Sequence, residues 1–440
     1  MVFQNNVLSG AAGSDTTVYE IEQSIRFNDN DSSYMYRAFS GAGNKKTATM
    51  SCWVKLGSNL SNRRGIFSFI GDVPLEIFTG DTLRVFTFGT TSLVTNRVFR
   101  DPSAWYHFVV SIDSTQSVST DRIRLYVNGQ RETSFSTESY PSLNADGTWW
   151  GSNFIQIGRT YGTSVYMDGY LAEIVYIDGT SLDPSSFGEY NSSGIWIPKD
   201  VSGLTFGTNG FYLKGADSSA LGTDSSGNGS NFTTSGLAAD DKKIDSPTNN
   251  HATWSPITGS AQVYSNGNLN AATASSAWKG GFTTIQVPLN SGTWYYEMYI
   301  DSAGSSSGQL SIGWSESDRS VTDNNDSGDT QGWVTYALNG KTYNNAASTV
   351  SYGATYTTGD VIGCKIDTDT SSNNITFYKN GASQGNLSEA FNGGTTGFIS
   401  PYILLYGTRN ATARFAQAEW TQTPSGITED NAINTKNLGS

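Results

Sequence analysis

The chain has 440 residues, and its 39 acidic against 26 basic side chains give a net charge of −13. This balance argues against a nucleic-acid-binding surface, which needs a basic patch to displace counterions from phosphates. Charged residues make up only 15% of the chain, whereas it holds 48 glycines and 12% aromatic residues, and no long amphipathic helical pattern is present. The composition therefore predicts an all-β protein of two or three domains with many turns.

The two cysteines, Cys52 and Cys364, lie in apolar strand patterns in different expected domains. We therefore expect two buried thiols rather than a disulfide. The first residues lack a basic start and a long apolar run, so no secretory signal is expected. No apolar run approaches the ~20 residues that a membrane span needs. These features predict a protein that is made and folded in a cytoplasm and has no membrane span.

The first half of the chain predicts a sandwich or jelly roll. Residues 1–17 are small and polar and are expected to form an N-terminal arm. Asn128-Gly129 predicts a tight hairpin turn. The expected strands of the domain at 18–200 cover residues 19–27, 47–56, 66–70, 83–88, 105–112, 123–130, 154–158 and 169–179.

The second half predicts another sandwich, at residues 248–420. Residues 201–247 are rich in Gly, Ser, Asn and Asp, and we expect them to form a semi-ordered connector. Residues 293–300 carry bulky side chains on both strand faces, which predicts a central strand covered on both sides. The polar tail, residues 421–440, is expected to dock on a neighbour or to stay disordered. Further expected strands cover residues 310–314, 333–336, 359–367 and 375–379, the last ending in an Asn-Gly turn.

The motifs of the two halves resemble two different families. The ordered phrases GTWYYE, IGW, GDVIGC and FYKNG resemble the SPRY domain, which implies a bent antiparallel sandwich that binds a ligand at loops without catalysis. The phrases WYHFVVSID, RIRLYVNGQ, FIQIG and MDGYLAEIVYIDGTSLDPSSFGEY resemble the laminin-G/concanavalin-like lectin fold. The expected fold is thus all-β, with two tandem concanavalin-like antiparallel β-sandwiches (jelly rolls), the second of them SPRY-like.

A third resemblance concerns the whole chain. The phrases YEIEQSIRFNDNDSSYMYR, LGTDSSGNGSNFT, DSPTNNHATWSP and TPSGITEDNAINTKNL look like those of virion structural proteins of marine tailed bacteriophages. Such chains often continue past the NTKNL phrase, so a simpler role than that of a full fibre is expected here. The resemblance implies a tail fibre or capsid-attached fibre in a virion assembled in the host cytoplasm. Its expected partners are other virion proteins, further copies of itself (a trimer above all) and a host cell-surface glycan or protein.

Catalytic chemistry is not expected. Lectin-like glycanases use paired carboxylates, typically in a Glu-x-Asp-x-x-Glu strand, and the chain contains no such run. With His107 and His251 as the only histidines, a zinc site or a Ser-His-Asp triad is not expected either. His107, within a strand pattern, is expected to be a half-buried structural residue.

No resident cofactor is expected, although calcium stays open. Asp323, Asn325 and Asp329 are suitably spread in one loop for oxygen ligation. The loops 28–31 and 224–228 are further candidates. The first loop lacks the bidentate Glu of an EF-hand, and ordinary turn chemistry explains Asn, Asp and Gly equally well.

Binding is the remaining function class. Exposed aromatic rings stack on sugars, so aromatic residues outside the strand periodicity are candidate ligand contacts. The competing interpretation places Trp149 or Trp150 under the sandwich rim and Trp333 in the core. The expected function is a non-enzymatic virion protein that binds host glycan or protein, with a purely structural capsid or tail component and a glycan-degrading tail enzyme as alternatives. The candidate ligand-binding residues are Trp149, Trp150, Tyr161, Tyr166, Trp278 and Trp333.

Overall fold

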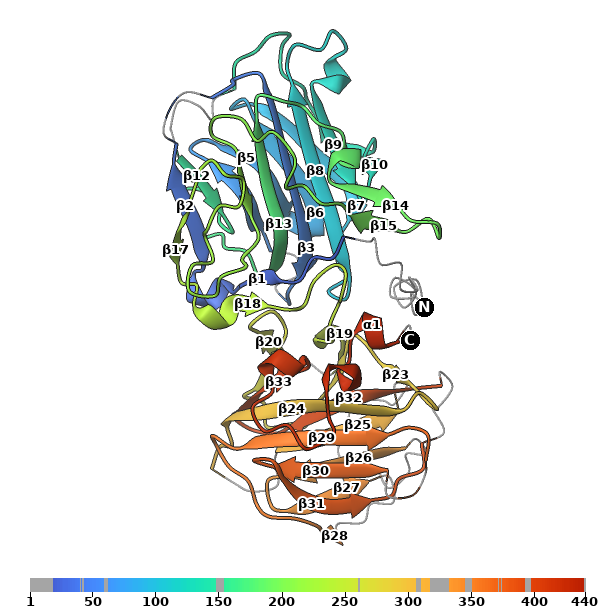
Figure 1. Cartoon of the computed structure of the whole chain (residues 1–440). Helices are drawn as coiled ribbons and strands as arrows, with labels where there is room; N and C mark the ends of the chain where they lie inside the picture. The colour runs from blue at the N-terminus through green and yellow to red at the C-terminus, as the bar shows by residue number, and fades with distance from the viewer. Residues whose placement is uncertain are drawn as a thin grey trace. The chain divides into compact units, whose positions relative to one another are not determined.

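The chain folds into two compact units whose boundary falls between Asn249 and Asn250 (Figure 1). Both are built almost entirely from antiparallel strands, which confirms the predicted all-β class. The computed structural model describes residues 19–39, 41, 43–58, 62–147, 154–259, 262–305, 310–316, 332–344, 350–370, 372, 374–391 and 397–438.

The first unit contains two large sheets and a small hairpin. Sheet 1 runs in the order β10 (Gln130–Arg131), β9 (Ile123–Val127), β8 (Trp105–Asp113), β3 (Thr47–Leu56), β13 (Gly169–Asp178), β1 (Ser24–Phe27) and β18 (Lys242–Lys243), with β16 (Phe211–Leu213) also paired to β13. Sheet 2 runs in the order β11 (Phe135–Glu138), β7 (Thr91–Val98), β6 (Thr82–Thr87), β5 (Asp72–Phe78), β4 (Arg64–Phe69), β12 (Phe154–Ile157), β2 (Tyr34–Ala38) and β17 (Thr233–Ser235). The hairpin pairs β14 (Gly188–Tyr190) with β15 (Trp196–Pro198), and 3-10 turns occupy Asp29–Asp31, Thr79–Asp81, Ser119–Asp121, Pro184–Ser186 and Ala239–Asp241.

Period-two alternation places one face of each sheet in a shared core. In β3, Met50, Cys52 and Val54 are fully buried in a cluster that also holds Met35 of β2 and Ile155 of β12. Strands of both sheets contribute to this cluster, which makes the first unit a sandwich. The opposite face of sheet 2 carries the residues that alternate with the core positions.

The connector is partly ordered, as expected, and the N-terminal strand is shorter than expected. Within residues 201–247, β17 and β18 extend the edges of sheets 2 and 1, and β16 pairs with β13 of sheet 1. The segment 19–23 is not in a strand, and β1 begins only at Ser24. The Asn128-Gly129 turn is as predicted, since both residues have positive φ (48° and 77°), as a type I′ hairpin requires.

The second unit is also a two-sheet sandwich. Sheet 3 runs in the order β19 (Trp254–Gly259), β22 (Lys279–Thr283), β32 (Phe398–Leu405), β25 (Leu310–Glu316), β26 (Trp333–Ala337), β27 (Lys341–Asn344) and β28 (Val350–Ser351), with β23 (Val287–Pro288) paired to β32. Sheet 4 runs in the order β20 (Val263–Ser265), β21 (Asn270–Thr273), β33 (Arg409–Arg414), β24 (Thr293–Ser302), β29 (Val361–Asp367), β30 (Ile375–Lys379) and β31 (Ala382–Leu387). Short 3-10 turns occupy Gln417–Glu419 and Glu429–Asn431, and the helix α1 covers Thr435–Leu438.

Strand β24 is central and covered on both faces, as predicted. Trp294, Tyr296 and Met298 point into the core, while Tyr295 on the other face packs with Trp420 of the C-terminal segment. Ile427 and Ala432 of the tail join the same cluster, so the tail packs on its own unit, which differs from the expectation that it docks on a neighbour or stays disordered.

Both cysteines are free and buried, as expected. Burial raises the pKa of both thiols, so neither behaves as a reactive thiolate. Every helix within the described ranges is too short or too polar to cross a bilayer.

Candidate functional site

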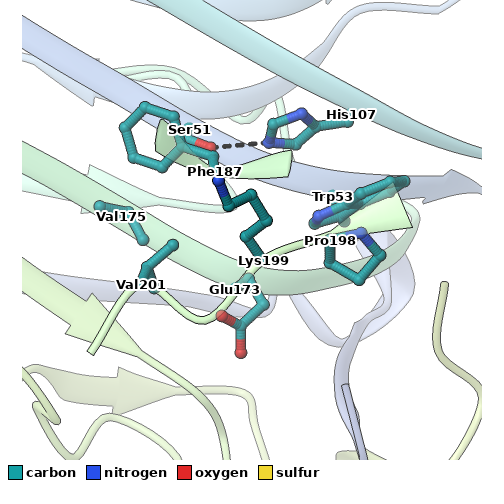
Figure 2. Close-up of a pocket in the computed structure, with 9 residues that line it drawn as sticks. All are labelled: Ser51, Trp53, His107, Glu173, Val175, Phe187, Pro198, Lys199 and Val201. Atoms are coloured by element: carbon teal, nitrogen blue, oxygen red, sulfur yellow. Dashed lines mark hydrogen bonds between the residues drawn. The ribbon is translucent and has the colours of Figure 1, made fainter. Parts of the chain in front are cut away.

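A small pocket lies between the outer face of sheet 1 and the segment that contains the β14–β15 hairpin (Figure 2). Its empty volume is about 190 Å³, including open solvent, and the space between the side chains does not admit a water-sized sphere. The lining residues are Ser51, Trp53, His107, Glu173, Val175, Phe187, Pro198, Lys199 and Val201. The combination of Ser, His and Glu resembles a hydrolase triad in composition, so its geometry decides whether it can catalyse.

The hydrogen bonds of His107 fix the wrong tautomer for catalysis. The indole N–H of Trp196 donates to Nδ1 over 3.0 Å, so that nitrogen must be an acceptor. In the neutral ring the hydrogen then sits on Nε2, which donates to Ser51 Oγ over 2.8 Å. A general base would need a lone pair on that nitrogen. Burial also lowers the pKa of His107 to about 3, so the imidazole stays neutral and structural.

The carboxylate of Glu173 is hydrogen-bonded to residues other than His107. It accepts hydrogen bonds from the hydroxyls of Tyr19, over 3.3 Å, and of Tyr212. In Figure 2 the carboxylate points away from the Ser51–His107 pair. The three polar residues thus belong to two separate hydrogen-bonded groups, Ser51 with His107 and Glu173 with the two tyrosines, and they form no catalytic triad.

The backbone of Glu173 is strained. Its φ is +49° inside strand β13, where the register with β3 shifts between Ala172 and Val175. A non-glycine residue in this region costs roughly 1–3 kcal/mol. Burial raises the pKa of Glu173 to about 7, although the hydrogen bond from Tyr212 and the charge of Lys214 act in the opposite direction. Sequence reasoning missed this residue; the available signal was a single acid inside an otherwise apolar strand.

A second candidate site lies on the outer face of sheet 2. Tyr34 and Tyr36 alternate with the buried Met35 in β2, and Phe154 alternates with the buried Ile155 in β12. All three outward rings are partly exposed. Tyr36 lies 5.7 Å from Tyr34 and stacks on Phe154 at 5.6 Å, measured between ring centroids.

A hairpin after β12 adds two more rings. Arg159 and Tyr166 form an isolated antiparallel bridge, which brings Tyr166 to 6.3 Å from Tyr34. Tyr161 meets Phe154 edge-on at 6.2 Å. We call the resulting continuous series the aromatic face; its members are Tyr166, Tyr34, Tyr36, Phe154 and Tyr161.

The aromatic face brings two predicted residues together and adds three that were missed. Tyr161 and Tyr166 are predictable from the sequence because they lie outside strand periodicity. Tyr34, Tyr36 and Phe154 were missed because strand aromatics were attributed to the core. The alternation Tyr34-Met35-Tyr36 was the available signal, since one methionine between two tyrosines puts both phenol rings opposite the buried side chain.

Two of the other predicted ligand residues, Trp278 and Trp333, lie in the second unit. Trp333 is only 1% exposed in β26, so its ring is in the interior, as the competing interpretation held, and it is withdrawn as a surface contact. Trp278 is partly buried in the second unit, 5.3 Å from Tyr406. Trp149 and Trp150 lie outside the described residues.

The candidate calcium loops show ordinary turn chemistry where they are described. Asn28 accepts from the backbone N–H of Asn30 and donates to Asp31 over 2.7 Å. The carboxylate of Asp224 accepts four hydrogen bonds, from Tyr212, Ser226 (twice) and Ser230, which leaves it poorly placed to bind a cation. The described ranges contain no cluster of three or more metal-binding side chains. Asp323, Asn325 and Asp329 lie outside those ranges.

Two family models match the chain. Residues 28–183 match the Concanavalin A-like lectin/glucanases superfamily, and residues 293–418 match the SPRY domain. A search of curated proteins gave no match.

Solved structures similar to the chain include the SPRY domain of human HERC1, with 19% identity over 36% of this chain and 96% of that one and a TM-score of 0.29. A suspected carbohydrate-binding protein from Bacteroides ovatus shares 18% identity over 49% of this chain and 58% of its own, with a TM-score of 0.35. Domains LG4-5 of mouse laminin alpha1 share 11% identity over 90% and 88%, with a TM-score of 0.29. Two stretches of the chain thus match domain families in succession: residues 28–183 match a concanavalin A-like, laminin-G-type domain and residues 293–418 match an SPRY domain.

Proposed function

We propose that the protein is a non-enzymatic virion structural protein, a tail fibre or capsid-attached fibre of a tailed bacteriophage, that binds a host cell-surface glycan. Its binding surface is the aromatic face of the lectin-like domain. Other virion proteins and further copies of the chain, as a trimer, are its structural partners.

The aromatic face carries this proposal. Five neighbouring rings stay partly exposed, although a soluble monomer gains by covering such a surface. The hydroxyls of Tyr34, Tyr36, Tyr161 and Tyr166 make no hydrogen bond to any described residue. Ring faces suited to stacking and free hydroxyls beside them are the groups with which proteins bind sugars.

Two further observations support a binding role over a catalytic one. Among the described residues the Ser51–His107 pair has the wrong tautomer for general-base catalysis. The carboxylate of Glu173 accepts hydrogen bonds from two tyrosine hydroxyls. Glycoside hydrolysis needs two carboxyl groups on opposite sides of the sugar bond.

The virion role is supported by the resemblance of several sequence phrases to those of phage virion structural proteins. In such an assembly a weak single site is sufficient, because several copies on one particle bind cooperatively through avidity. The net charge of −13 favours solubility and disfavours binding to nucleic acid, because like charges repel.

Glycan binding is tested with the purified full chain on a glycan array. The double substitution Tyr36→Ala with Phe154→Ala should weaken binding at least about tenfold, which corresponds to ~1.4 kcal/mol. Tyr190→Ala is the matched control, since Tyr190 is 45% exposed in the same unit but outside the aromatic face. The pair Trp149→Ala with Trp150→Ala tests the remaining predicted contacts. A chain that binds no glycan would favour the purely structural alternative, and release of reducing sugar from host polysaccharide would favour the enzyme.

The virion assignment needs its own test. Antibody labelling of the chain in micrographs of the particle should mark fibres at the tail or capsid. Absence of the label from purified particles would contradict it, whatever the array shows.

A further inference from the structure

Arg159 lies beside the aromatic face and, unlike most of the described arginines, pairs with no described carboxylate. In the described residues, carboxylates pair with Arg26, Arg63, Arg64, Arg84, Arg100, Arg124, Arg131 and Arg414. Arg159 pairs with none of the described carboxylates, although acidic residues outnumber basic ones in the chain. The one hydrogen bond that its guanidinium makes to a described residue runs from Nε to the carbonyl of Thr163 over 2.8 Å.

Two rings of the aromatic face hold this guanidinium. Its central carbon lies 4.9 Å from the ring centroid of Tyr34 and 5.2 Å from that of Tyr166. Contact with ring faces fixes the guanidinium plane while its terminal N–H groups remain available at the edge. Arg159 is partly exposed, so an incoming ligand can reach that edge.

We propose that the aromatic face binds a sugar that carries an anionic group, with Arg159 as the anion's partner and the neighbouring rings as the stacking surface. A planar guanidinium forms two parallel hydrogen bonds with a carboxylate or a sulfate, which a neutral sugar cannot replace. The ligand class is therefore an acidic glycan, either uronic or sulfated. This inference rests on the proposed glycan-binding function and makes it more specific.

The test compares three polysaccharides of different charge. Affinity electrophoresis of the full chain is run in gels that contain alginate (carboxylate), dextran sulfate (sulfate) or dextran (neutral). The wild type should bind at least one acidic polymer about tenfold or more tightly than dextran, as expected for a charge-assisted hydrogen bond. Arg159→Gln should abolish that difference, and Arg159→Lys should restore it only in part, since a lysine keeps the charge but not the planar fork.

Arg97→Gln is the matched control. Arg97 is exposed, stacks over Phe99 at 5.1 Å and pairs with no described carboxylate, but it lies on β7, away from the aromatic face. Equal loss in both glutamine variants would show that only net charge matters and would overturn the inference. A preference for acidic polymers that persists in Arg159→Gln would also overturn the inference, and so would equal binding of all three polymers. Neither of these two outcomes contradicts the proposed glycan-binding function. Failure of the wild type to bind any of these polymers or any glycan on the array would overturn both.

Discussion

The indole N–H of Trp196 donates to Nδ1 of His107 over 3.0 Å, and Trp53 stacks on the same imidazole with ring centroids 4.7 Å apart. Trp53 and Trp196 lie in strands of different sheets, β3 and β15, so the histidine joins the β14–β15 hairpin to sheet 1. The neutral ring is thus a structural link whose protonation would disrupt the hydrogen bond to Nδ1. This arrangement predicts how the first unit responds to acid.

The first prediction concerns the acid stability that depends on His107. Burial holds its pKa at about 3 in the folded chain, against an ordinary value of 6.5. Between these two values the unfolded state binds the extra proton, so the free energy of unfolding should fall as the pH drops from about 6.5 towards 3. His107→Asn removes this titration. Urea unfolding at pH 7, 5.5 and 4.5 should show a lower stability for the variant at pH 7 but a shallower decline with acid, and equal slopes would contradict the prediction.

Much of this architecture follows from sequence periodicity alone. Strand β3, Thr47–Leu56, was predicted with its observed bounds, because alternating Met50, Cys52 and Val54 define one apolar face. The asparagine-glycine turns were equally predictable, since positive φ at both positions favours these two residues: Asn380 and Gly381 have φ of 47° and 80°.

The remaining features depend on contacts between distant segments. The strand β17 pairs with β2 through Thr233–Ser235, which look like linker residues in the sequence. The positive φ of Glu173 arises from a bulge, and no local pattern marks it. Trp333 could not be assigned to surface or core from the sequence, because a tryptophan at a strand start fits both. Periodicity therefore identifies strands and core, whereas edge pairing and the grouping of outward rings from different strands require the fold.

The second prediction concerns Glu173, whose pKa is raised by burial, whereas that of His107 is lowered. Its folded value of about 7 lies above the ordinary 4.5, so the folded state holds the proton more tightly. The stability of the first unit should therefore decline as the pH rises from about 4.5 to 7 and level off above that value. Glu173→Gln keeps an acceptor for Tyr212 and should raise the free energy of unfolding at pH 8 by up to roughly 3 kcal/mol. Chemical denaturation at pH 5 and 8 measures this; a gain that is the same at both pH values would contradict the assigned cause.

The third prediction concerns the buried pair between Lys55 and Asp245. Lys55 Nζ lies 2.7 Å from the carboxylate, and the two side chains are 1% and 8% exposed. Asp245 also accepts from the indole of Trp105 over 3.1 Å, so the pair ties the end of the 201–247 segment to sheet 1. Lys55→Met should destabilise the first unit by ~3–5 kcal/mol, because it leaves a buried carboxylate without its cation.

A surface pair provides the control for this prediction. Arg131 and Asp121 lie 2.8 Å apart with both side chains 37% exposed, so Arg131→Gln should cost less than ~1 kcal/mol. The double variant Lys55→Met with Asp245→Leu should recover part of the loss seen for Lys55→Met alone. If Lys55→Met proves as mild as Arg131→Gln in urea unfolding, the pair does not hold the segment.

The last prediction concerns the C-terminal segment that covers β24. The carboxylate of Glu297 is buried and accepts from the backbone N–H groups of Thr421 and Gln422, each over 2.8 Å. Trp420 packs edge-on against Tyr295 at 4.8 Å, so both polar and apolar contacts hold the segment on sheet 4. Glu297→Gln weakens two charge-assisted hydrogen bonds and should cost ~1.5–3 kcal/mol, and Trp420→Ala should cost a similar amount.

Hydrogen exchange distinguishes local release of this segment from global destabilisation. Both variants should lose amide protection first in residues 415–438, while the amides of β25 and β32 in sheet 3 keep theirs. Arg409→Gln in β33 serves as a comparison, because it alters sheet 4 without touching Glu297 or Trp420. If protection falls uniformly across the second unit, the segment is part of its cooperative core. If amide protection falls only in residues 415–438, this segment unfolds separately from the sandwich and shields Tyr295 on sheet 4 from solvent.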